Sequence, residues 1–167
     1  MPPTFRHRSL ADFSALSVDD AAALVALARS LQRQRCAGSA GLPLKGKNLA
    51  VVLATPDDGE AAAFERVAAP LGARVACLCP GLSERSSDAE VQRTAALLGR
   101  LYDAVDCVRM APALVQRVNA LADIPVFEGI TSSTHPIGAL AELLDPDTPV
   151  QARRCLLIQA VLIRTLN

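Results

Sequence analysis

Short apolar runs without polar alternation recur along the chain, and a segment of helical character follows each of them. Strands that alternate apolar and polar residues have one wet face, whereas strands covered on both faces do not alternate. Such strands joined by helices predict a parallel sheet with right-handed crossovers. We therefore expect one α/β domain on a doubly wound, four-stranded parallel sheet flanked by helices. The expected strands are 48–54, 74–79, 104–108 and 124–127, and the helices that follow them are 60–71, 88–100, 112–122 and 135–144.

Two further helices are expected outside this alternation. The segment 17–36 has Ser17 as a potential N-cap, acids in its first turn and arginines near its end. The segment 149–166 is apolar around most of its circumference, which indicates burial rather than a helix lying on a membrane surface. We expect these N- and C-terminal helices to pack together on the sheet. The whole chain, 1–167, is predicted to form a single domain with a flexible tail at 1–8.

The charge composition excludes several kinds of partner. The 17 Lys and Arg residues balance 17 Asp and Glu residues, and aromatic residues make up 3% of the chain. A neutral chain poor in aromatics has neither the charge nor the stacking groups that nucleic acids require. The sequence has no charge-free apolar run long enough for a membrane span and no secretory signal. We therefore predict a cytoplasmic protein with no nucleic-acid or membrane partner.

The five cysteines are Cys36, Cys77, Cys79, Cys107 and Cys155. Their number is odd, and they contain no C-x-x-C pair, which argues against a disulfide framework or a zinc site. Three of them lie in apolar strand-like runs, where a cysteine behaves as a small hydrophobic residue. We expect core thiols, no metal and no cofactor. In sheets of this kind ligands bind beyond the carboxyl ends of the strands, here in the loops 55–60, 80–87, 109–111 and 129–135.

The order of several motifs resembles the aspartate/ornithine carbamoyltransferase family, and ornithine carbamoyltransferases most of all. Residues 94–104 (TAALLGRLYDA) resemble the family's T-A-R-V-L-G-R-M-Y-D-A/G. Residues 124–131 (IPVFEGIT) resemble V-P-V-x-N-G-L-T, and 134–144 (THPIGALAELL) resemble F-H-P-x-Q-x-L-A-D-L-L. The resemblance is colinear from 9 to 144, with further matches at 9–13, 43–50, 63–65 and 72–75.

The family resemblance implies a particular domain organisation. Family members have a first domain that binds carbamoyl phosphate and makes trimer contacts, and a second domain that binds the amino acid. This chain resembles only the first domain. Residues 149–166 resemble the family's final helix, which returns from the second domain to pack on the first. We expect a natural compact unit in which the link 145–149 stands in place of the second domain.

The phosphate motif is where the resemblance fails. The family has S-T-R-T-R at a helix N-terminus, where backbone N–H groups, hydroxyls and guanidinium groups hold the phosphate. Here the segment reads Asp57-Asp58-Gly59-Glu60-Ala61, so both arginines are lost and three carboxylates have entered. Each charge-assisted hydrogen bond contributes about 1.5–3 kcal/mol, so losing three or four weakens binding about 10³-fold or more. The acids either cap the helix or form a site for a cation or a basic partner.

Two other parts of the implied site are also altered. The arginine that the family has after its third strand falls on Val108, and Arg109 is one residue away. The family's next loop supplies a lysine from a neighbouring subunit, but here Asp88 lies near that position and Arg85 is the nearest cation. A bulge at Arg109 would restore the first of these charges.

The motif H-P-x-Q is half retained. His135 and Pro136 are present, but Gly138 stands in place of the glutamine. In the family the histidine bonds the carbamoyl oxygen and polarises the carbonyl, an oxyanion-type role. A histidine at the start of a helix can equally be structural.

The sequence therefore predicts a carbamoyltransferase-like protein that is non-catalytic, a pseudoenzyme, and acts through association. The expected partner is a second copy, in a trimer, or a full-length paralogue. The alternative is residual carbamoyl-phosphate binding or carbamoyl transfer in arginine, ornithine or pyrimidine metabolism. A third possibility is a cation or amine ligand at the strand ends. The candidate site has His135 as the catalytic residue, and its substrate-binding positions are Asp57, Asp58, Gly59, Glu60, Arg109, His135 and Pro136.

Overall fold

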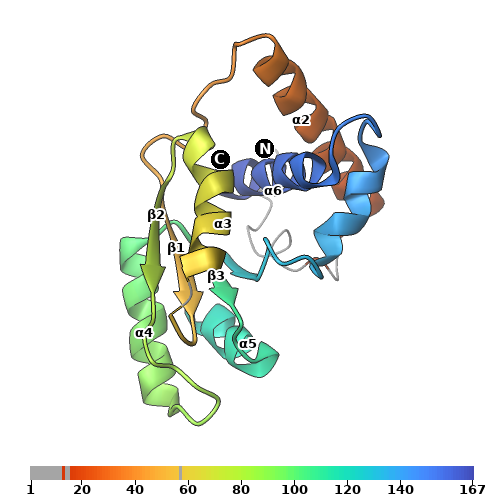
Figure 1. Ribbon diagram of the computed structural model, residues 1–167. Coiled ribbons are helices and arrows are strands. Elements are labelled where there is room, and N and C mark those ends of the chain that lie inside the picture. The colour runs from red at the N-terminus through yellow and green to blue at the C-terminus, as the bar shows by residue number, and fades with distance from the viewer. Residues whose placement is uncertain (1–12, 14–15, 57) are drawn as a thin grey trace, which may run out of the picture.

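A single parallel sheet organises the computed structural model, which describes Phe13, residues 16–56 and residues 58–167 (Figure 1). Its strand order is β2-β1-β3-β4. The bounds are β1 Asn48–Leu53, β2 Arg74–Leu78, β3 Ala104–Val108 and β4 Val126–Glu128. All three neighbouring pairs run parallel. The predicted four-stranded parallel sheet is confirmed.

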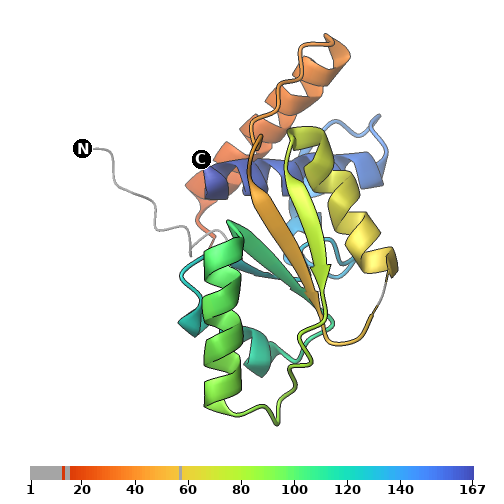
Figure 2. The ribbon, with the colours of Figure 1, turned by 90° about the vertical axis from the view of Figure 1, so that its left-hand side faces the viewer.

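The crossover helices cover opposite faces of the sheet. The helix α3 (Asp58–Ala68) continues into the short 3-10 helix η2 (Ala69–Leu71). The helices α4 (Asp88–Leu101) and α5 (Pro112–Leu121) follow β2 and β3. Figure 2 shows α3 (yellow) and α4 (green) on opposite sides of the sheet. The chain moves outward from β1 to β2 and then returns to β3, so the winding reverses between β1 and β3.

Alternate residues of β1 pack into two separate hydrophobic cores. Leu49, Val51 and Leu53 pack with one cluster, and Ala50 and Val52 pack with the other. The first cluster includes residues of α2, α3 and α6, and the second includes residues of α4 and α5. A strand buried on both faces explains why this run shows no polar alternation. The predicted doubly wound architecture follows from this division.

The terminal helices pack together as predicted. They are α2 (Val18–Cys36) and α6 (Val150–Leu166), and they contact each other and the α3 side of the sheet. Ser17 caps α2, because its side-chain oxygen accepts a hydrogen bond from the Asp20 backbone N–H at 3.1 Å. In α6, nearly every residue from Leu156 to Leu166 is buried. The predicted tail, 1–8, lies outside the described residues.

The helix expected at 135–144 is present, as the 3-10 helix η3 (Pro136–Leu143). Gly138 weakens helix formation there, and Arg153 and Arg29 donate to the carbonyl oxygens of Ala141 and Leu143. These side chains donate to carbonyl oxygens that would accept from backbone N–H groups if the helix continued.

The expectation that the cysteines are core thiols is wrong for most of them. Cys107 is buried, but Cys36, Cys77 and Cys79 are exposed and Cys155 is partly buried. Cys77 belongs to β2, whose residues are exposed or only partly covered, and Cys79 follows it directly. The reason is the position of β2 at the edge of the sheet, where the helices cover it incompletely. Within the described residues, no helix is long and apolar enough to cross a membrane.

Candidate functional site

A cleft of about 550 Å³ lies at the carboxyl ends of β3 and β4. Its walls come from residues 107–110 after β3, from 128–136 after β4 and from Glu60 in the first turn of α3. Three of the four predicted loops therefore meet here. The fourth, 80–87, contributes none of the described residues that line this cleft. The cleft lies beside the point where the winding of the sheet reverses, which is where ligands are expected to bind in an open α/β fold.

Arg109 and Glu60 form the charged pair of the cleft. The Nε atom of Arg109 lies 3.5 Å from Oε1 of Glu60. Arg109 has a φ of 54°, and it is the one non-glycine residue of the described part of the chain with a positive φ. This left-handed turn directly after β3 brings the Arg109 side chain into the cleft, whereas Val108 is buried. The sequence suggested that a bulge at Arg109 would be needed to supply this charge. The left-handed turn lies at that same residue.

Glu128 is a site residue that the sequence reasoning missed. It ends β4, is exposed and lines the same cleft as Glu60 and Arg109. The available signal was its place in the motif V-P-V-x-N-G-L-T, where Glu128 replaces an asparagine. Glu128 is therefore a second carboxylate in a cleft where Glu60 already pairs with Arg109.

His135 caps the η3 helix. Its Nδ1 atom accepts a hydrogen bond from the Ile137 backbone N–H at 3.2 Å, and Phe13 meets its ring edge-on with centroids 4.8 Å apart. Burial, and then the Arg154 charge, lower the pKa of His135 to about 4. The imidazole is therefore neutral at physiological pH, with its proton on Nε2. Pro136, the first residue of η3, also lines the cleft.

Arg154 of α6 occupies space next to Gly138. Its guanidinium donates to the backbone carbonyl oxygens of Ser132 and Ser133. A Cβ atom built on Gly138 would lie 2.5 Å from Nη1 of Arg154. The glycine that replaces the family's glutamine therefore makes room for an arginine from the C-terminal helix.

Asp106 supports the cleft from inside the sheet. It lies in the middle of β3 and is fully buried. Its Oδ1 atom accepts from the Ile130 backbone N–H at 3.1 Å, while Oδ2 has no hydrogen-bond partner among the described residues. Burial raises the pKa of Asp106 to about 7, opposed by the backbone bonds of Ile130 and Gly129 and assisted by the Glu60 charge. This carboxyl group holds the turn that follows β4, and sequence reasoning did not single it out.

The remaining predicted positions begin α3. Asp58 is its first residue, Gly59 its second and Glu60 its third, so Glu60 lies in the first turn as expected. Carboxylates are favoured there because the helix N-terminus carries a partial positive charge. Asp57 and the side chain of Asp58 lie outside the described part of the structure. Their contact with a substrate or a cation stays a prediction.

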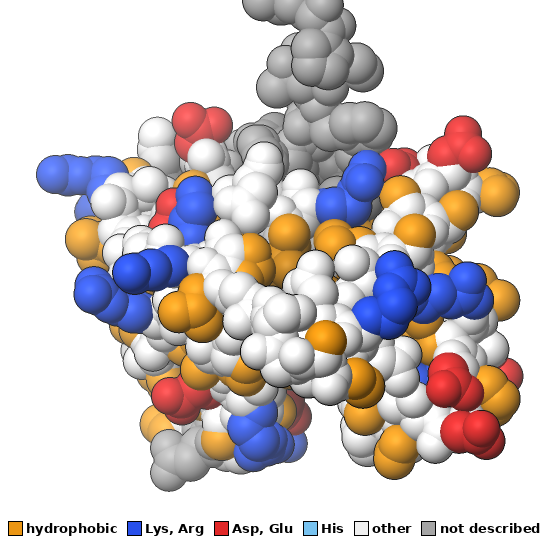
Figure 3. All heavy atoms as spheres, turned by 90° about the horizontal axis from the view of Figure 1, so that it is seen from above, with side chains coloured by type: hydrophobic (Ala, Val, Ile, Leu, Met, Phe, Trp, Pro, Cys, Tyr) orange, Lys and Arg blue, Asp and Glu red, His pale blue; other side chains and the backbone are white. Residues whose placement is uncertain are grey.

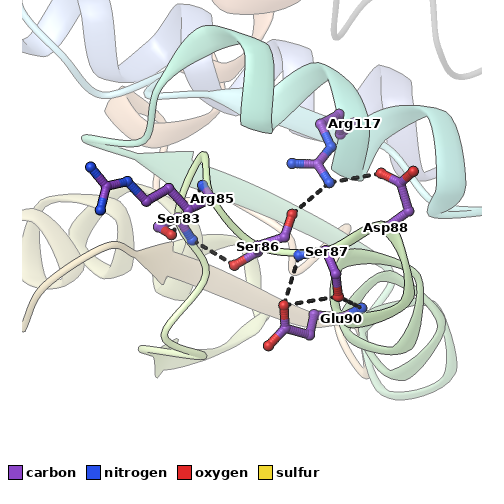
Figure 4. A network of polar contacts seen from close by, with 7 residues as sticks. All are labelled: Ser83, Arg85, Ser86, Ser87, Asp88, Glu90 and Arg117. Carbon is purple, nitrogen blue, oxygen red and sulfur yellow. Dashed lines mark hydrogen bonds and ion pairs between the residues drawn. The ribbon is translucent and has the colours of Figure 1, made fainter.

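The loop between β2 and α4 is held by Arg117 of α5 (Figure 4). The Nη2 atom of Arg117 donates to the Ser86 carbonyl oxygen at 2.8 Å and to Oδ1 of Asp88 at 2.8 Å. Asp88, which stands near the position of the implied lysine, therefore pairs with Arg117 at the start of α4. Figure 4 shows the Arg85 guanidinium pointing away from the other residues drawn.

Charged side chains of both signs are mixed on the face of the molecule seen in Figure 3. Figure 3 shows Lys and Arg side chains in separate groups on the face seen from above, interspersed with Asp and Glu. Separate groups differ from the continuous basic stripe that marks nucleic-acid binders. Among the described residues, no group of three or more His, Cys, Asp or Glu side chains is placed to hold a metal ion.

Comparison with known families gives one match to a family model. Residues 8–146 match the model described as "Aspartate/ornithine carbamoyltransferase, carbamoyl-P binding domain". The ornithine carbamoyltransferase of Haemophilus influenzae strain PittGG is 35% identical over 121 residues, which are 72% of this chain and 36% of that protein. The ornithine carbamoyltransferase of Cutibacterium acnes is 32% identical over 139 residues, which are 83% of this chain and 42% of that protein. The chain thus spans well under half the length of these curated relatives.

Solved structures agree with this match. The ornithine carbamoyltransferase of Pyrococcus furiosus superimposes with a TM-score of 0.67 at 25% identity, covering 82% of this chain and 44% of that one. The Thermus thermophilus enzyme gives a TM-score of 0.64 at 28% identity, covering 80% and 46%. The described fold is therefore the fold of one part of these larger proteins.

Proposed function

The chain belongs to the aspartate/ornithine carbamoyltransferase family and corresponds to its carbamoyl-phosphate-binding domain, and from the acidic cleft we propose that it does not transfer carbamoyl groups. In this proposal it acts by associating with copies of itself, as a trimer, or with a full-length relative. It has no catalytic cofactor and works in the cytoplasm. The helix α6 serves as the equivalent of the family's final helix.

The single observation that carries the proposal is the pairing of Arg109 with Glu60 at 3.5 Å, beside Glu128 in the same cleft. A phosphate dianion entering this cleft must compete with Glu60 for the guanidinium and approach two carboxylates. Like charges disfavour an anion, and the arginines of the family's phosphate loop are replaced here by Gly59 and Ala61. The cleft therefore lacks the charge that a leaving group of this kind requires.

Support for association comes from the loop between β2 and α4. Arg117 fixes this loop, and Arg85 points out of it (Figure 4). On the neighbouring helix, Leu97 and Leu101 are 55% and 54% exposed, and they lie four residues apart on one side of α4. The leucines lie in the C-terminal half of α4 and the loop lies before its start, so each of them is a separate candidate contact for a second protein chain.

Titration calorimetry with carbamoyl phosphate tests the loss of substrate binding. We expect no binding heat at millimolar ligand, with the Haemophilus influenzae ornithine carbamoyltransferase as the positive control. Saturable heat that disappears in His135→Asn or Arg109→Gln would overturn the non-catalytic assignment. It would instead support residual carbamoyl-phosphate binding.

Light scattering at micromolar concentration tests association. We expect a stable oligomer, and we expect Arg85→Glu to shift it towards the monomer. Arg33→Glu, on an exposed part of α2, is the charge-matched control and should leave the mass unchanged. A wild-type monomer that also fails to bind a full-length relative would contradict the proposal.

Residual binding remains the second candidate because of one observation on His135. Its Nδ1 accepts from Ile137, so the neutral ring keeps its proton on Nε2, and the ring lines the cleft. A neutral Nε2–H can donate to a carbonyl oxygen. If it does so here, carbamoyl phosphate binding will be weak and will depend on His135 without requiring the acidic residues.

A further inference from the structure

A second concave region lies between α2, α6 and the segment that leads into β1. It encloses about 380 Å³, and it shares no lining residue with the cleft described above. Its walls are mainly apolar and include Leu27 and Leu31 of α2 and Ile163 of α6. We call it the α2–α6 groove. Its size lies within the range of small-molecule sites.

A buried glutamine lies at the base of the groove. Gln159 is 0% exposed, although its neighbours in α6 are apolar. Its Nε2 atom donates to the Val67 carbonyl oxygen at 2.8 Å, and its Oε1 atom accepts from Nη2 of Arg35 at 2.9 Å. A buried amide is costly unless it is hydrogen-bonded, and both ends of this one are. Gln159 therefore fixes the position of the Arg35 guanidinium.

Arg35 supplies a positive charge to the groove. The Arg35 guanidinium also contacts the Cys155 thiol, which is neutral at physiological pH because burial raises its pKa. Among the ion pairs of the described residues, none joins Arg35 to a carboxylate. The groove thus combines apolar walls with one oriented cation whose charge no described carboxylate balances.

The outer wall of the groove is held in place by Gly72. Gly72 has a φ of 90°, and a Cβ atom on it would come within 3.0 Å of Leu42 Cβ and 3.2 Å of the Lys45 backbone. The Leu44 N–H also donates to the Leu71 carbonyl oxygen at 2.8 Å. The segment that supplies Gly41, Leu42 and Pro43 to the groove is therefore packed against Leu71 and Gly72.

We propose that the α2–α6 groove binds a small monocarboxylate with an apolar body. The carboxylate pairs with Arg35, and the hydrocarbon or ring lies along Leu27, Leu31 and Ile163. One guanidinium matches one negative charge, and Arg35 is the one cation among the described residues that line the groove, whereas a phosphate dianion carries two charges. The proposal is independent of the function assigned to the cleft, since the two regions have no residue in common.

A titration with sodium octanoate, monitored by calorimetry and by protein NMR, tests this site. We expect saturable binding, with octan-1-ol at least about tenfold weaker and octylammonium without effect, because the cation attracts only the carboxylate. Resonances of Leu27, Leu31 and Ile163 should shift together. No saturable binding, or equal binding of octanoate and octanol, would overturn the proposal.

Two variants place the ligand in the groove. Arg35→Gln should weaken octanoate at least about tenfold and leave octanol unchanged. Ala40→Trp, in an exposed lining residue, should fill the groove and weaken both compounds. If Arg35→Gln fails to fold, Ala40→Trp carries the test. Arg33→Gln, two residues away on the exposed part of α2, should bind octanoate like the wild type. Unchanged octanoate affinity in the groove variants would refute the site.

Discussion

The Nε atom of Arg109 lies 3.5 Å from Oε1 of Glu60, so the arginine that enters the cleft is paired with a carboxylate of the same cleft. The two side chains come from different elements, one from the turn after β3 and one from the first turn of α3. The proposed loss of phosphate binding rests on this pairing. The pair also defines the first testable change.

Glu60→Gln should increase the affinity of the cleft for inorganic phosphate. The substitution removes one carboxylate and the ion pair that it makes with Arg109. An exposed pair of this kind contributes about 0.5–1 kcal/mol, which corresponds to a two- to fivefold gain in affinity. A phosphorus NMR titration measures it. Glu65→Gln, an exposed residue of the same helix, is the control, and an equal gain there would show a general charge effect only.

Gly138→Ala should destabilise the protein by up to about 1 kcal/mol, because the added methyl group meets Nη1 of Arg154 at 2.5 Å and displaces this guanidinium from the Ser132 and Ser133 carbonyl oxygens. Arg154→Ala in the same chain removes the clashing group, so the double variant should recover part of the loss. Chemical denaturation of the two single variants and the double variant gives the coupling. Gly99→Ala serves as control, since its Cβ would meet its nearest neighbour at 3.8 Å. Additive effects would contradict the proposed contact.

In the wild type, the stability that Asp106 contributes should fall as the pH rises, and Asp106→Asn should abolish this dependence on pH. The pKa of Asp106 is about 7 in the folded chain and near 3.8 when unfolded, so the folded state holds the proton more tightly. Its contribution is most favourable below about pH 3.8 and declines up to about pH 7. The variant should therefore gain on the wild type between pH 4 and pH 7, as measured by denaturation at several pH values. A constant difference between the two proteins would show that Asp106 does not titrate in this range.

In the wild type, the stability that His135 contributes should fall as the pH is lowered, and His135→Asn should abolish this dependence on pH. The pKa of His135 is about 4 in the folded chain and 6.5 in the unfolded chain, so the unfolded state binds the proton more readily. This contribution is fully present above about pH 6.5 and is lost as the pH falls towards 4. Asparagine can cap η3 in place of Nδ1, so the variant should fold and lose less stability than the wild type in acid. Parallel curves for the two proteins would argue against a buried neutral histidine.

Local sequence patterns predicted the elements, but not the contacts between distant ones. Ser17 and the acids after it marked the start of α2, and the unbroken apolar run of β1 indicated burial on both faces. Exposure of Cys77 depends on which strand lies at the edge, and the order β2-β1-β3-β4 is a property of the whole sheet. The contact of Arg35 with Gln159 joins elements far apart in the chain, and that of Arg154 with Gly138 depends on how α6 packs against η3. No local spacing encodes such pairs, and the same holds for the unpartnered oxygen of Asp106.

Arg117→Gln should loosen the loop before α4. It removes the bond to the Ser86 carbonyl oxygen and the bond to Asp88, each 2.8 Å in length. Asp88 is 98% exposed, so its ion pair contributes little, and the loss should come mainly from Ser86, at about 1 kcal/mol. Amide hydrogen exchange should become faster at residues 83–88, while the sheet remains protected.

The same variant links the loop to the proposed association, because Arg85 would no longer be held in one place. Light scattering should then show weaker oligomers for Arg117→Gln, as it does for Arg85→Glu, although Arg85 itself is intact. Arg66→Gln, an exposed residue of α3 on the opposite side of the sheet from α4, is the matched control and should leave both exchange and mass unchanged. Faster exchange with an unchanged oligomer would separate the two roles and show that the loop is ordered for the stability of the monomer alone.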